Sequence, residues 1–576
     1  MRQYDAVQCA NTTLFSVFDS LFLRPVTAAH SEQLTGMWIG ANNGCSYPNY
    51  LDVRDNHIFA GLAGYLATTL NLRSGEQIEK ASAQIVTGNL FQMLGVNAAL
   101  GRTFEPGEAQ LRREPRLVVA SHGFWQRRLR GDPNAIGRTL NPNGQAFTLI
   151  GVLPQGYRSV DGLGLVPELY VPASPFLIPD LNNRHRSTLH LVGRLQPGHT
   201  TQQTRAALTA FVQRLEQTYP KENDGFKRSH SVVYPLSGLR GIFGAAGDGG
   251  DESVALVLFF AILQVVVGLV LLIACGNVAG LLLARSVNRR REMAIRLALG
   301  ARRSQIVRQL LVESSMLTFG SLGVAELLNL WIAPLLHSIP VPGPEPLELQ
   351  LQPDPSIVAY SLALAIVTTL LCGLAPAFQS TRLSLVPALK QEIGQLGHRR
   401  FSLRHVLVSG QVAVSAILLI ASLLFLRSLI HINRVDPGFD TDHTLAVELD
   451  LEKNRYPKQK AAQFVERAIE RVQQLPDVES TSVAALIPMS GNAFGTAYET
   501  QDRPNVRGPQ SRYHLVGPRY FHTMGIPVLR GREFQRDDQM PGAAHVAIIN
   551  ETFARRYFPD RDPLGIVSRN HRCGAR

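Results

Sequence analysis

Four long apolar blocks interrupt a chain of otherwise mixed polarity. Residues 253–284 contain no Asp, Glu, Lys or Arg, and the other blocks are residues 309–337, 356–378 and 406–430. A helix of about 20 apolar residues crosses the hydrocarbon core of a bilayer, whereas a buried helix of a soluble protein is rarely so long and so uniformly apolar. The pattern predicts four transmembrane helices.

The regions before and after these blocks have the pattern of folded domains. A strand, a helix and a strand are predicted at 189–236, and the same order is predicted again at 444–489. A sharper repeat pairs "VTGNLFQMLGVNAALGRTF" from Val86 with "VGPRYFHTMGIPVLRGREF" from Val516. The aligned pairs are Phe91 and Phe521, Gly95 and Gly525, Gly101 and Gly531, Arg102 and Arg532, and Phe104 and Phe534. Glycines at fixed offsets predict the same tight turns in two copies of one domain.

Charge sets the expected orientation of the apolar blocks. The chain of 576 residues has 57 Lys and Arg against 45 Asp and Glu, a net charge of +12. Between the first two blocks lie Arg285, Arg289, Arg290, Arg291, Arg296, Arg302, Arg303 and Arg308, opposed only by Glu292. The next loop, 338–355, has no Lys or Arg, and the third, 379–405, is again basic. Because basic loops stay in the cytoplasm, residues 27–252 and 431–576 are expected on the external side of the membrane.

The basic charge does not indicate nucleic-acid binding. The sequence has no basic stripe with interleaved aromatic residues, which such binding would require.

One carboxylate, Glu326, falls near the middle of the second apolar block. A charged side chain in lipid is costly, so it should face other helices or water. Two interpretations stay open at this point: a polar contact within a helix bundle, or a tolerated side chain that is protonated or reaches the membrane surface.

Several motifs together resemble one known family. "RRREMAIRLALGARRSQIVRQLLVES" from Arg289 resembles the cytoplasmic loop and following helix of FtsX/MacB-type ABC transporter permeases. "SYPNYLDVRDNHIFAGLAGY" from Ser46 resembles the MacB-type periplasmic core domain, and "QVAVSAILLIASLLFLRSLIHINRVDPGFDT" from Gln411 resembles the start of a second permease half. The two-copy layout is similar to the duplicated orphan permeases, the ADOP group, and the resemblance covers residues 11–565.

The resemblance implies a multi-pass α-helical membrane protein of the bacterial inner membrane with two α+β periplasmic domains of the MacB-like core type. The expected layout is a remnant of a first transmembrane helix at 11–26, periplasmic core domain 1 at 27–252, transmembrane helices at 253–284, 309–337 and 356–378, a cytoplasmic coupling loop at 285–308, a short external loop at 338–355, a linker between the halves at 379–405, a helix of the second half at 406–430, and an incomplete periplasmic core domain 2 at 431–576. In that family each half has one helix, one external domain and three helices, so the chain resembles one that is truncated at both ends.

The motif GxxxxGK[ST] does not occur in the sequence, so no ATP-binding loop is expected in this chain. The resemblance then implies a separate cytoplasmic ATPase subunit, which a short amphipathic helix would contact with apolar anchors and rim charges. The expected coupling residues are Arg291, Glu292, Met293, Ile295, Arg296, Leu299 and Gly300. The alternative is that the arginines only fix the topology and touch lipid phosphates.

Two functions remain open. The first is a permease subunit that couples ATP hydrolysis to movement of the periplasmic domains for export or periplasmic extrusion. The second is an FtsX-like signalling or scaffold protein that regulates an external partner without transport. The resemblance implies the lipid bilayer as a further partner and allows a periplasmic or outer-membrane one. An enzyme is not expected, because the sequence has no HExxH, no GxSxG and no His, Asp and Cys cluster, and no catalytic, metal or cofactor residues are expected.

Overall fold

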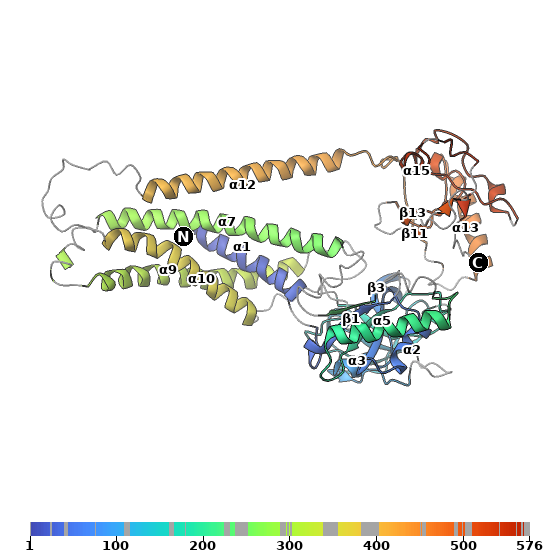
Figure 1. The fold of residues 1–576 in the computed structure, drawn as a ribbon, viewed down its shortest axis with the longest axis horizontal. Helices are drawn as coiled ribbons and strands as arrows, with labels where there is room; N and C mark the ends of the chain where they lie inside the picture. Colours follow the sequence, from blue (N-terminus) through green and yellow to red (C-terminus); the bar gives the residue numbers. More distant parts are fainter. Residues whose placement is uncertain are drawn as a thin grey trace. The chain divides into compact units, whose positions relative to one another are not determined.

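The computed structural model divides the chain into two compact units, Met1–Leu424 and Phe425–Arg576, each of which is described by itself (Figure 1). The residues described are 2–23, 26–39, 44–74, 77–108, 116–160, 166–178, 180–223, 231–236, 251–288, 295–296, 299, 302–337, 355–381, 403–449, 451, 457–488, 494–497, 499–500, 510–540, 542–559, 561–565 and 568–569.

The first unit contains a ten-stranded mixed sheet with the order β10-β1-β9-β2-β3-β8-β5-β7-β4, and β6 pairs with β7. The strands are β1 (Leu34–Trp38), β2 (Gly61–Ser74), β3 (Gln77–Val86), β4 (Leu100–Gly101), β5 (Leu117–Ala120), β6 (Thr139–Leu140), β7 (Phe147–Val152), β8 (Leu169–Pro172), β9 (His190–Arg194) and β10 (Val232–Pro235). The strand, helix and strand predicted at 189–236 are confirmed as β9, α5 (Thr201–Thr218) and β10.

Helices cover both faces of this sheet. Alternate strand residues point to opposite faces, so Leu62 and Val118 join one core cluster while Ala63 and Val119 join the other. The first cluster packs under α2 (Tyr47–Asp55), α4 (His122–Leu129) and α5, and the second under α3 (Leu90–Leu94). The described residues from β1 to β10 therefore form an α+β domain with two apolar layers.

The rest of the first unit is helical. Its helices are α1 (Arg2–Phe18), which continues into a short π-helix η1 (Asp19–Leu23), α7 (Asp251–Asn288), α9 (Arg303–His337), α10 (Pro355–Thr381) and α12 (Leu403–Arg434). All four apolar blocks lie inside helices. Among the described residues three helices are long and apolar enough to cross a membrane, over Val257–Leu281, Val307–Asn329 and Val408–Arg434, and Pro355–Leu371 is a shorter apolar stretch. The first helix begins at Arg2, earlier than the remnant predicted at 11–26.

The second unit has smaller elements. They are α13 (Lys458–Gln473), α14 (Tyr520–Thr523), the 3-10 helix η5 (Arg536–Gln539), α15 (Glu551–Tyr557), and the strands β11 (Phe494–Ala497), β12 (Glu499–Thr500), β13 (Gln510–Tyr513) and β14 (Ser568–Arg569). Strand β11 pairs with β13 and β12 with β14. These elements make two separate strand pairs and no larger sheet within the described residues.

The strands predicted at 444–489 are wrong within the described residues. Residues 444–449 form no strand, and Ala484 makes only an isolated bridge to Val516. A strand requires a hydrogen-bonding neighbour, and none of the described residues pairs with 444–449. The repeat alignment also changes, because Gly517 N–H donates to Val483 O as Thr87 N–H donates to Gly64 O. Residues near Val483 therefore correspond to β2 and not to β10.

Candidate functional site

The predicted coupling segment is described at Ile295, Arg296 and Leu299. Ile295 and Arg296 are helical, and Leu299 N–H donates to Ile295 O at 3.0 Å, which closes one helical turn. Ile295 is 45% and Leu299 is 83% exposed, and residues four apart lie on the same side of a helix. Arg291, Glu292, Met293 and Gly300 lie outside the described residues.

This turn is attached to the start of α9. Arg296 Nη1 donates to Gln309 Oε1 at 3.0 Å, and Arg302 N–H donates to Gln305 Oε1 at 2.9 Å. The first bond joins the side chain of the turn to α9, and the second closes the first turn of α9 itself.

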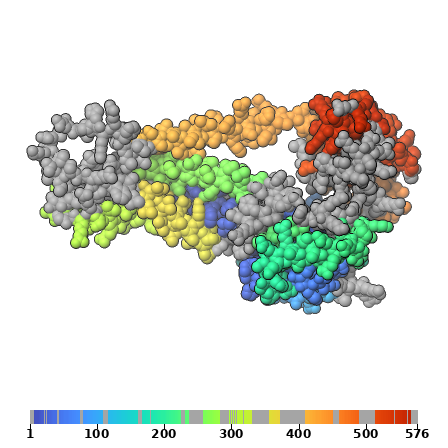
Figure 2. All heavy atoms as spheres, viewed as in Figure 1, coloured from blue at the N-terminus to red at the C-terminus, as the bar shows by residue number. Residues whose placement is uncertain are grey.

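A second feature is the buried face of α1, which is polar. Gln8, Thr12 and Ser16 of α1, and Ser20 of the adjoining η1, are each 0% exposed and follow one another at intervals of four residues, close to one helical turn. The apolar side chains of α1, such as Phe15, are only half-buried. In Figure 1 α1 lies among α7, α9 and α10, and in Figure 2 only part of its surface is visible between them.

Side-chain hydrogen bonds join α1 to each of its three neighbours. Gln264 of α7 donates from Nε2 to Asn11 Oδ1 at 2.8 Å and to Tyr360 Oη of α10 at 2.6 Å. On the side of α9, Thr13 Oγ1 donates to Asn329 Oδ1 at 3.1 Å. These contacts involve amides and hydroxyls, which are the usual polar contacts between transmembrane helices.

Glu326 belongs to the same polar interior. Ser361 Oγ donates to Glu326 Oε1 at 3.0 Å, and Ser361 Oγ lies 3.4 Å from Thr12 Oγ1. The carboxylate of α9 is thus connected through α10 to α1. Glu326 therefore makes a polar contact with α10, and its role in a membrane stays a prediction.

Polarity in this bundle is reversed relative to a soluble helical protein. Buried hydroxyl residues of α9 and α10 are Ser314, Thr318, Ser321, Ser361, Thr368 and Thr369. Exposed apolar residues of the bundle include Leu258, Ile262, Val265, Met316, Leu327, Trp331, Val358 and Ile366. In water such an outer surface would be a large apolar patch, whereas in lipid the apolar residues face acyl chains and the polar groups find partners inside.

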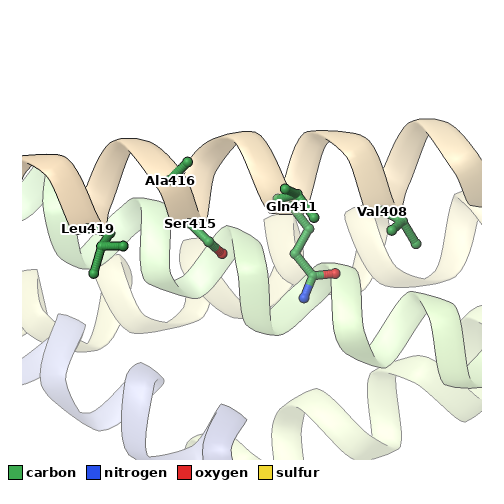
Figure 3. A pocket seen from close by; sticks show the side chains of 6 residues that line it. Val408, Gln411, Ser415, Ala416 and Leu419 are labelled. Carbon is green, nitrogen blue, oxygen red and sulfur yellow. The ribbon is translucent and has the colours of Figure 1, made fainter.

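A polar pair joins helix α12 to α7. Gln411 Nε2 donates to Asn277 Oδ1 at 2.8 Å, and Figure 3 shows the Gln411 side chain pointing from α12 toward α7. A shallow groove on α12 is lined by Val408, Gln411, Val412, Ser415, Ala416 and Leu419. The span Val408–Arg434 of α12 is otherwise unburied.

The two domain copies share one ion-pair motif that the sequence comparison did not find. Arg102 binds Glu108 through both guanidinium nitrogens, at 3.0 and 2.6 Å, and Glu108 also accepts from Glu105 N–H at 3.0 Å. Arg532 binds Asp538 in the same way, at 2.7 Å for both contacts, and Asp538 accepts from Gln535 N–H at 2.8 Å. The acid lies six residues after the arginine in both copies, and this spacing was the available signal.

The ion pair shifts the titration of both acids. Hydrogen bonds from Arg102 chiefly lower the pKa of Glu108. Those from Arg532, with the Gln535 N–H bond, lower the pKa of Asp538 to about 2. A pKa below that of the unfolded chain means that the stabilising contribution is complete above the unfolded pKa and is lost as the pH falls through the folded one.

We expect Asp538 to titrate near pH 2 and Arg532→Gln to return its pKa toward about 3.9, the value of a free Asp side chain. Carboxyl ¹³C shifts of the chain labelled at aspartate would measure this, with Asp538→Asn identifying the resonance. An Asp538 resonance that titrates near pH 4 in the unmodified chain would show that the pair does not form.

No group of three or more His, Cys, Asp or Glu residues with metal-binding geometry occurs in the part of the chain that the structure describes. The polar groups found are hydrogen-bonding amides, hydroxyls and paired carboxylates. The amides and hydroxyls join helices of the bundle, and the paired carboxylates stabilise a turn in each domain copy.

Two family models match the sequence. The model described as "FtsX-like permease C-terminal" matches residues 264–385, which include most of α7, the turn at Ile295 and Leu299, α9 and α10. The model described as "MacB-like periplasmic core domain" matches residues 9–211 and again 412–570, together more than half of the chain. The second match confirms the internal duplication predicted from the repeat.

Curated relatives include two export proteins. The macrolide export ATP-binding/permease protein MacB of Chromobacterium violaceum is 24% identical over 321 residues, which are 54% of this chain and 44% of that protein. The pyoverdine export ATP-binding/permease protein PvdT of Pseudomonas savastanoi pv. phaseolicola is 36% identical over 124 residues, 21% of this chain and 17% of that protein. The chain spans less than half the length of these relatives.

Solved structures with detectable likeness include the periplasmic region of MacB from Actinobacillus actinomycetemcomitans, at 13% identity and a TM-score of 0.27, covering 36% of this chain and 90% of that one. The extracellular domain of the noncanonic ABC-type transporter YknZ from Gram-positive bacteria has 12% identity and a TM-score of 0.26, covering 35% of this chain and 98% of that one.

Proposed function

The chain belongs to the family of MacB/FtsX-type ABC transporter permeases, and we propose that it is a permease subunit driven by a separate ATPase. ATP hydrolysis by that subunit would move the helix bundle and, through it, the periplasmic domains, in export or periplasmic extrusion. The curated relatives are named export ATP-binding/permease proteins. This sequence has no ATP-binding loop, and in this proposal a separate ATPase binds the nucleotide.

The observation that carries this proposal is the exposed turn at Ile295 and Leu299. Two aliphatic side chains stand exposed one turn apart, and Arg296 fixes the turn to α9 through Gln309. A partner protein that displaces this turn would therefore also displace α9. Arginines that only set the membrane topology would need neither the two exposed aliphatic side chains nor the hydrogen bond to α9.

We further propose a multi-pass protein of the bacterial inner membrane with its domains in the periplasm. The basic segment 285–308 would face the cytoplasm, and this side is also where an ATPase resides. The reversed polarity of the bundle supports the membrane assignment, because its apolar outer side chains and its buried hydroxyl and amide contacts suit a lipid environment.

Replacing both exposed aliphatic residues of the turn by aspartate should weaken binding of the ATPase. We expect Ile295→Asp with Leu299→Asp to weaken association at least about tenfold, because an interface anchor is replaced by a charge that must be desolvated. The tagged chain is purified in detergent from the cell that encodes it and photolabelled with 8-azido-ATP. The expected result is a labelled second polypeptide that the double variant loses.

Leu445→Asp is the matched control, since Leu445 is 88% exposed, as Leu299 is, but lies in the second unit. It should leave the labelled polypeptide in place. A labelled polypeptide that stays with the double variant at the level of the control would exclude the turn as the coupling contact, and the absence of any labelled polypeptide from the unmodified chain would contradict the ATPase partner itself.

A further inference from the structure

The C-terminal end of α12 has a basic face, formed by Arg427, His431 and Arg434. These residues follow one another at intervals of four and three, which places them on the same side of the helix. All three are exposed, and none of their side chains forms a hydrogen bond or an ion pair with another described residue. The nearest acid in the sequence, Asp436, accepts instead from Gly438 N–H at 2.8 Å.

Apolar side chains adjoin this basic face. Ile430 is 43% exposed and lies beside Arg427 and Arg434, whereas Leu429 is 46% exposed and lies on the opposite side of the helix. Basic and apolar groups on one segment suit the surface of a membrane, where the charged ends reach headgroups and the apolar groups contact acyl chains.

The depth of the basic face in a membrane follows from the apolar segment before it. Residues 406–426 contain no Asp, Glu, Lys, Arg or His, and as a helix they are about 31 Å long, close to the thickness of the hydrocarbon core, about 30 Å. In the proposed membrane placement Arg427 therefore lies where the core ends. His431 and Arg434 lie about 6 Å and about 10 Å further out, and long arginine side chains can reach the layer of phosphates from both sides.

Two ordinary reasons for basic residues in a membrane helix do not account for Arg427. Basic residues in the last turn stabilise the helix dipole, which applies to His431 and Arg434, whereas Arg427 lies two turns before the end. The positive-inside rule favours arginine at the cytoplasmic end of a helix, and in the proposed orientation this is the external end.

We propose that the basic face binds the phosphate of an anionic phospholipid in the external leaflet. The guanidinium and imidazole N–H groups donate to the phosphate oxygens, and the positive charge of the two arginines is attracted to the negative charge of the lipid. This inference goes beyond the proposed function. It depends on the proposed membrane placement and not on the ATPase.

The site is tested by photocross-linking of lipid to the full chain. The photoreactive residue benzoylphenylalanine replaces Ile430, and in a matched control it replaces Leu429. Each chain is reconstituted in phosphatidylcholine vesicles that contain a trace of ³²P-labelled phosphatidylglycerol or, separately, of ³²P-labelled phosphatidylcholine. The probe at 430 should take up the anionic lipid severalfold more than the neutral one, and the probe at 429 should take up both about equally.

Removing both arginines should abolish this preference. Arg427→Gln with Arg434→Gln should lower the uptake ratio at 430 to that at 429, because each arginine near the membrane surface attracts anionic lipid. Arg467→Gln with Arg471→Gln is the control, since both arginines are exposed on α13 and the loss of charge is the same. A ratio that survives the first pair of substitutions, or falls equally with the second, would overturn the proposal.

Three further outcomes would also overturn it. Equal uptake of the two lipids at 430 would mean that the basic face does not select anionic lipid. Loss of the preference in excess inorganic phosphate at constant ionic strength would mean that free phosphate, and not lipid, is bound. Absence of lipid label at both probes would contradict the membrane placement itself. The azido-ATP labelling is a separate measurement, so its result stands whatever the lipid uptake shows.

Discussion

Phe91→Ala should destabilise the first α+β domain by about 3–5 kcal/mol, the usual cost of truncating a fully buried phenylalanine. Phe91 is 0% exposed. Its ring lies 5.4 Å from the ring of Tyr170, 5.8 Å from that of Phe104 and 6.1 Å from that of Tyr157, measured between centroids. Removing it leaves a cavity bounded by three aromatic rings that the fixed strands cannot close.

The second copy provides the matched control for this variant. Phe521 occupies the equivalent position and meets Phe534 at 6.2 Å, but it is only half-buried. Phe521→Ala therefore removes less buried area and should cost clearly less. Pulse proteolysis of the full chain in urea measures both, provided that the fragments of the two units are read separately. Equal losses in the two variants would contradict the assignment of Phe91 to a closed core.

Patterns that depend on neighbours in sequence could be predicted. Each apolar block is helical, because uniform hydrophobicity over the span of a bilayer is a local property of the chain. The turns shared by the two copies are confirmed as well. Gly95 and Gly525 have φ of +70° and +67°, and Gly101 and Gly531 have φ of +72° and +86°. A positive φ favours glycine, so the positions of the glycines in the sequence were enough to predict these turns.

The polar face of α1 could not be predicted from its sequence. Gln8, Asn11 and Thr12 give the segment a low hydropathy, and only the resemblance to the family implied the remnant of a helix at 11–26. Their burial depends on Gln264, Ser361 and Asn329, which are contributed by helices hundreds of residues away. Hydropathy depends on composition and does not show which side chains form hydrogen bonds. The polar contacts at the centre of the bundle could therefore not be predicted.

The strands predicted at 444–489 in the second copy are wrong for a related reason. Leu445, Val447 and Leu449 alternate as a strand would, yet they are 88%, 71% and 52% exposed and form no ladder. In the first copy the first strand of the predicted strand, helix and strand, β9, lies between β1 and β2. The alternation of apolar residues shows only that a segment can form a strand. Whether it pairs with another strand depends on residues far away in the sequence.

Gly101→Ala should destabilise the first domain by about 2–5 kcal/mol, the sum of a strained left-handed residue and of overpacking. A Cβ atom at this position would lie 2.1 Å from Ile150 O and 3.1 Å from Ile136 Cδ1. The obstacle is backbone, because Gly101 pairs with Gly151 across β4 and β7. To admit the methyl group, the two strands must separate and weaken the bond from Arg102 N–H to Ile150 O, now 2.9 Å.

Gly531→Ala separates the two causes. Gly531 has a φ of +86°, but the only atom that an added Cβ would approach is Leu564 Cδ2, at 3.3 Å, among the described residues. It should show the conformational cost alone, about 1–2 kcal/mol. Hydrogen exchange in the full chain measures the local opening, at the β4 and β7 amides for Gly101→Ala and at the amides next to Gly531 for Gly531→Ala. Equal effects of the two alanines would mean that the close approach of β4 to β7 contributes nothing, and that the positive φ alone explains why both copies have glycine here.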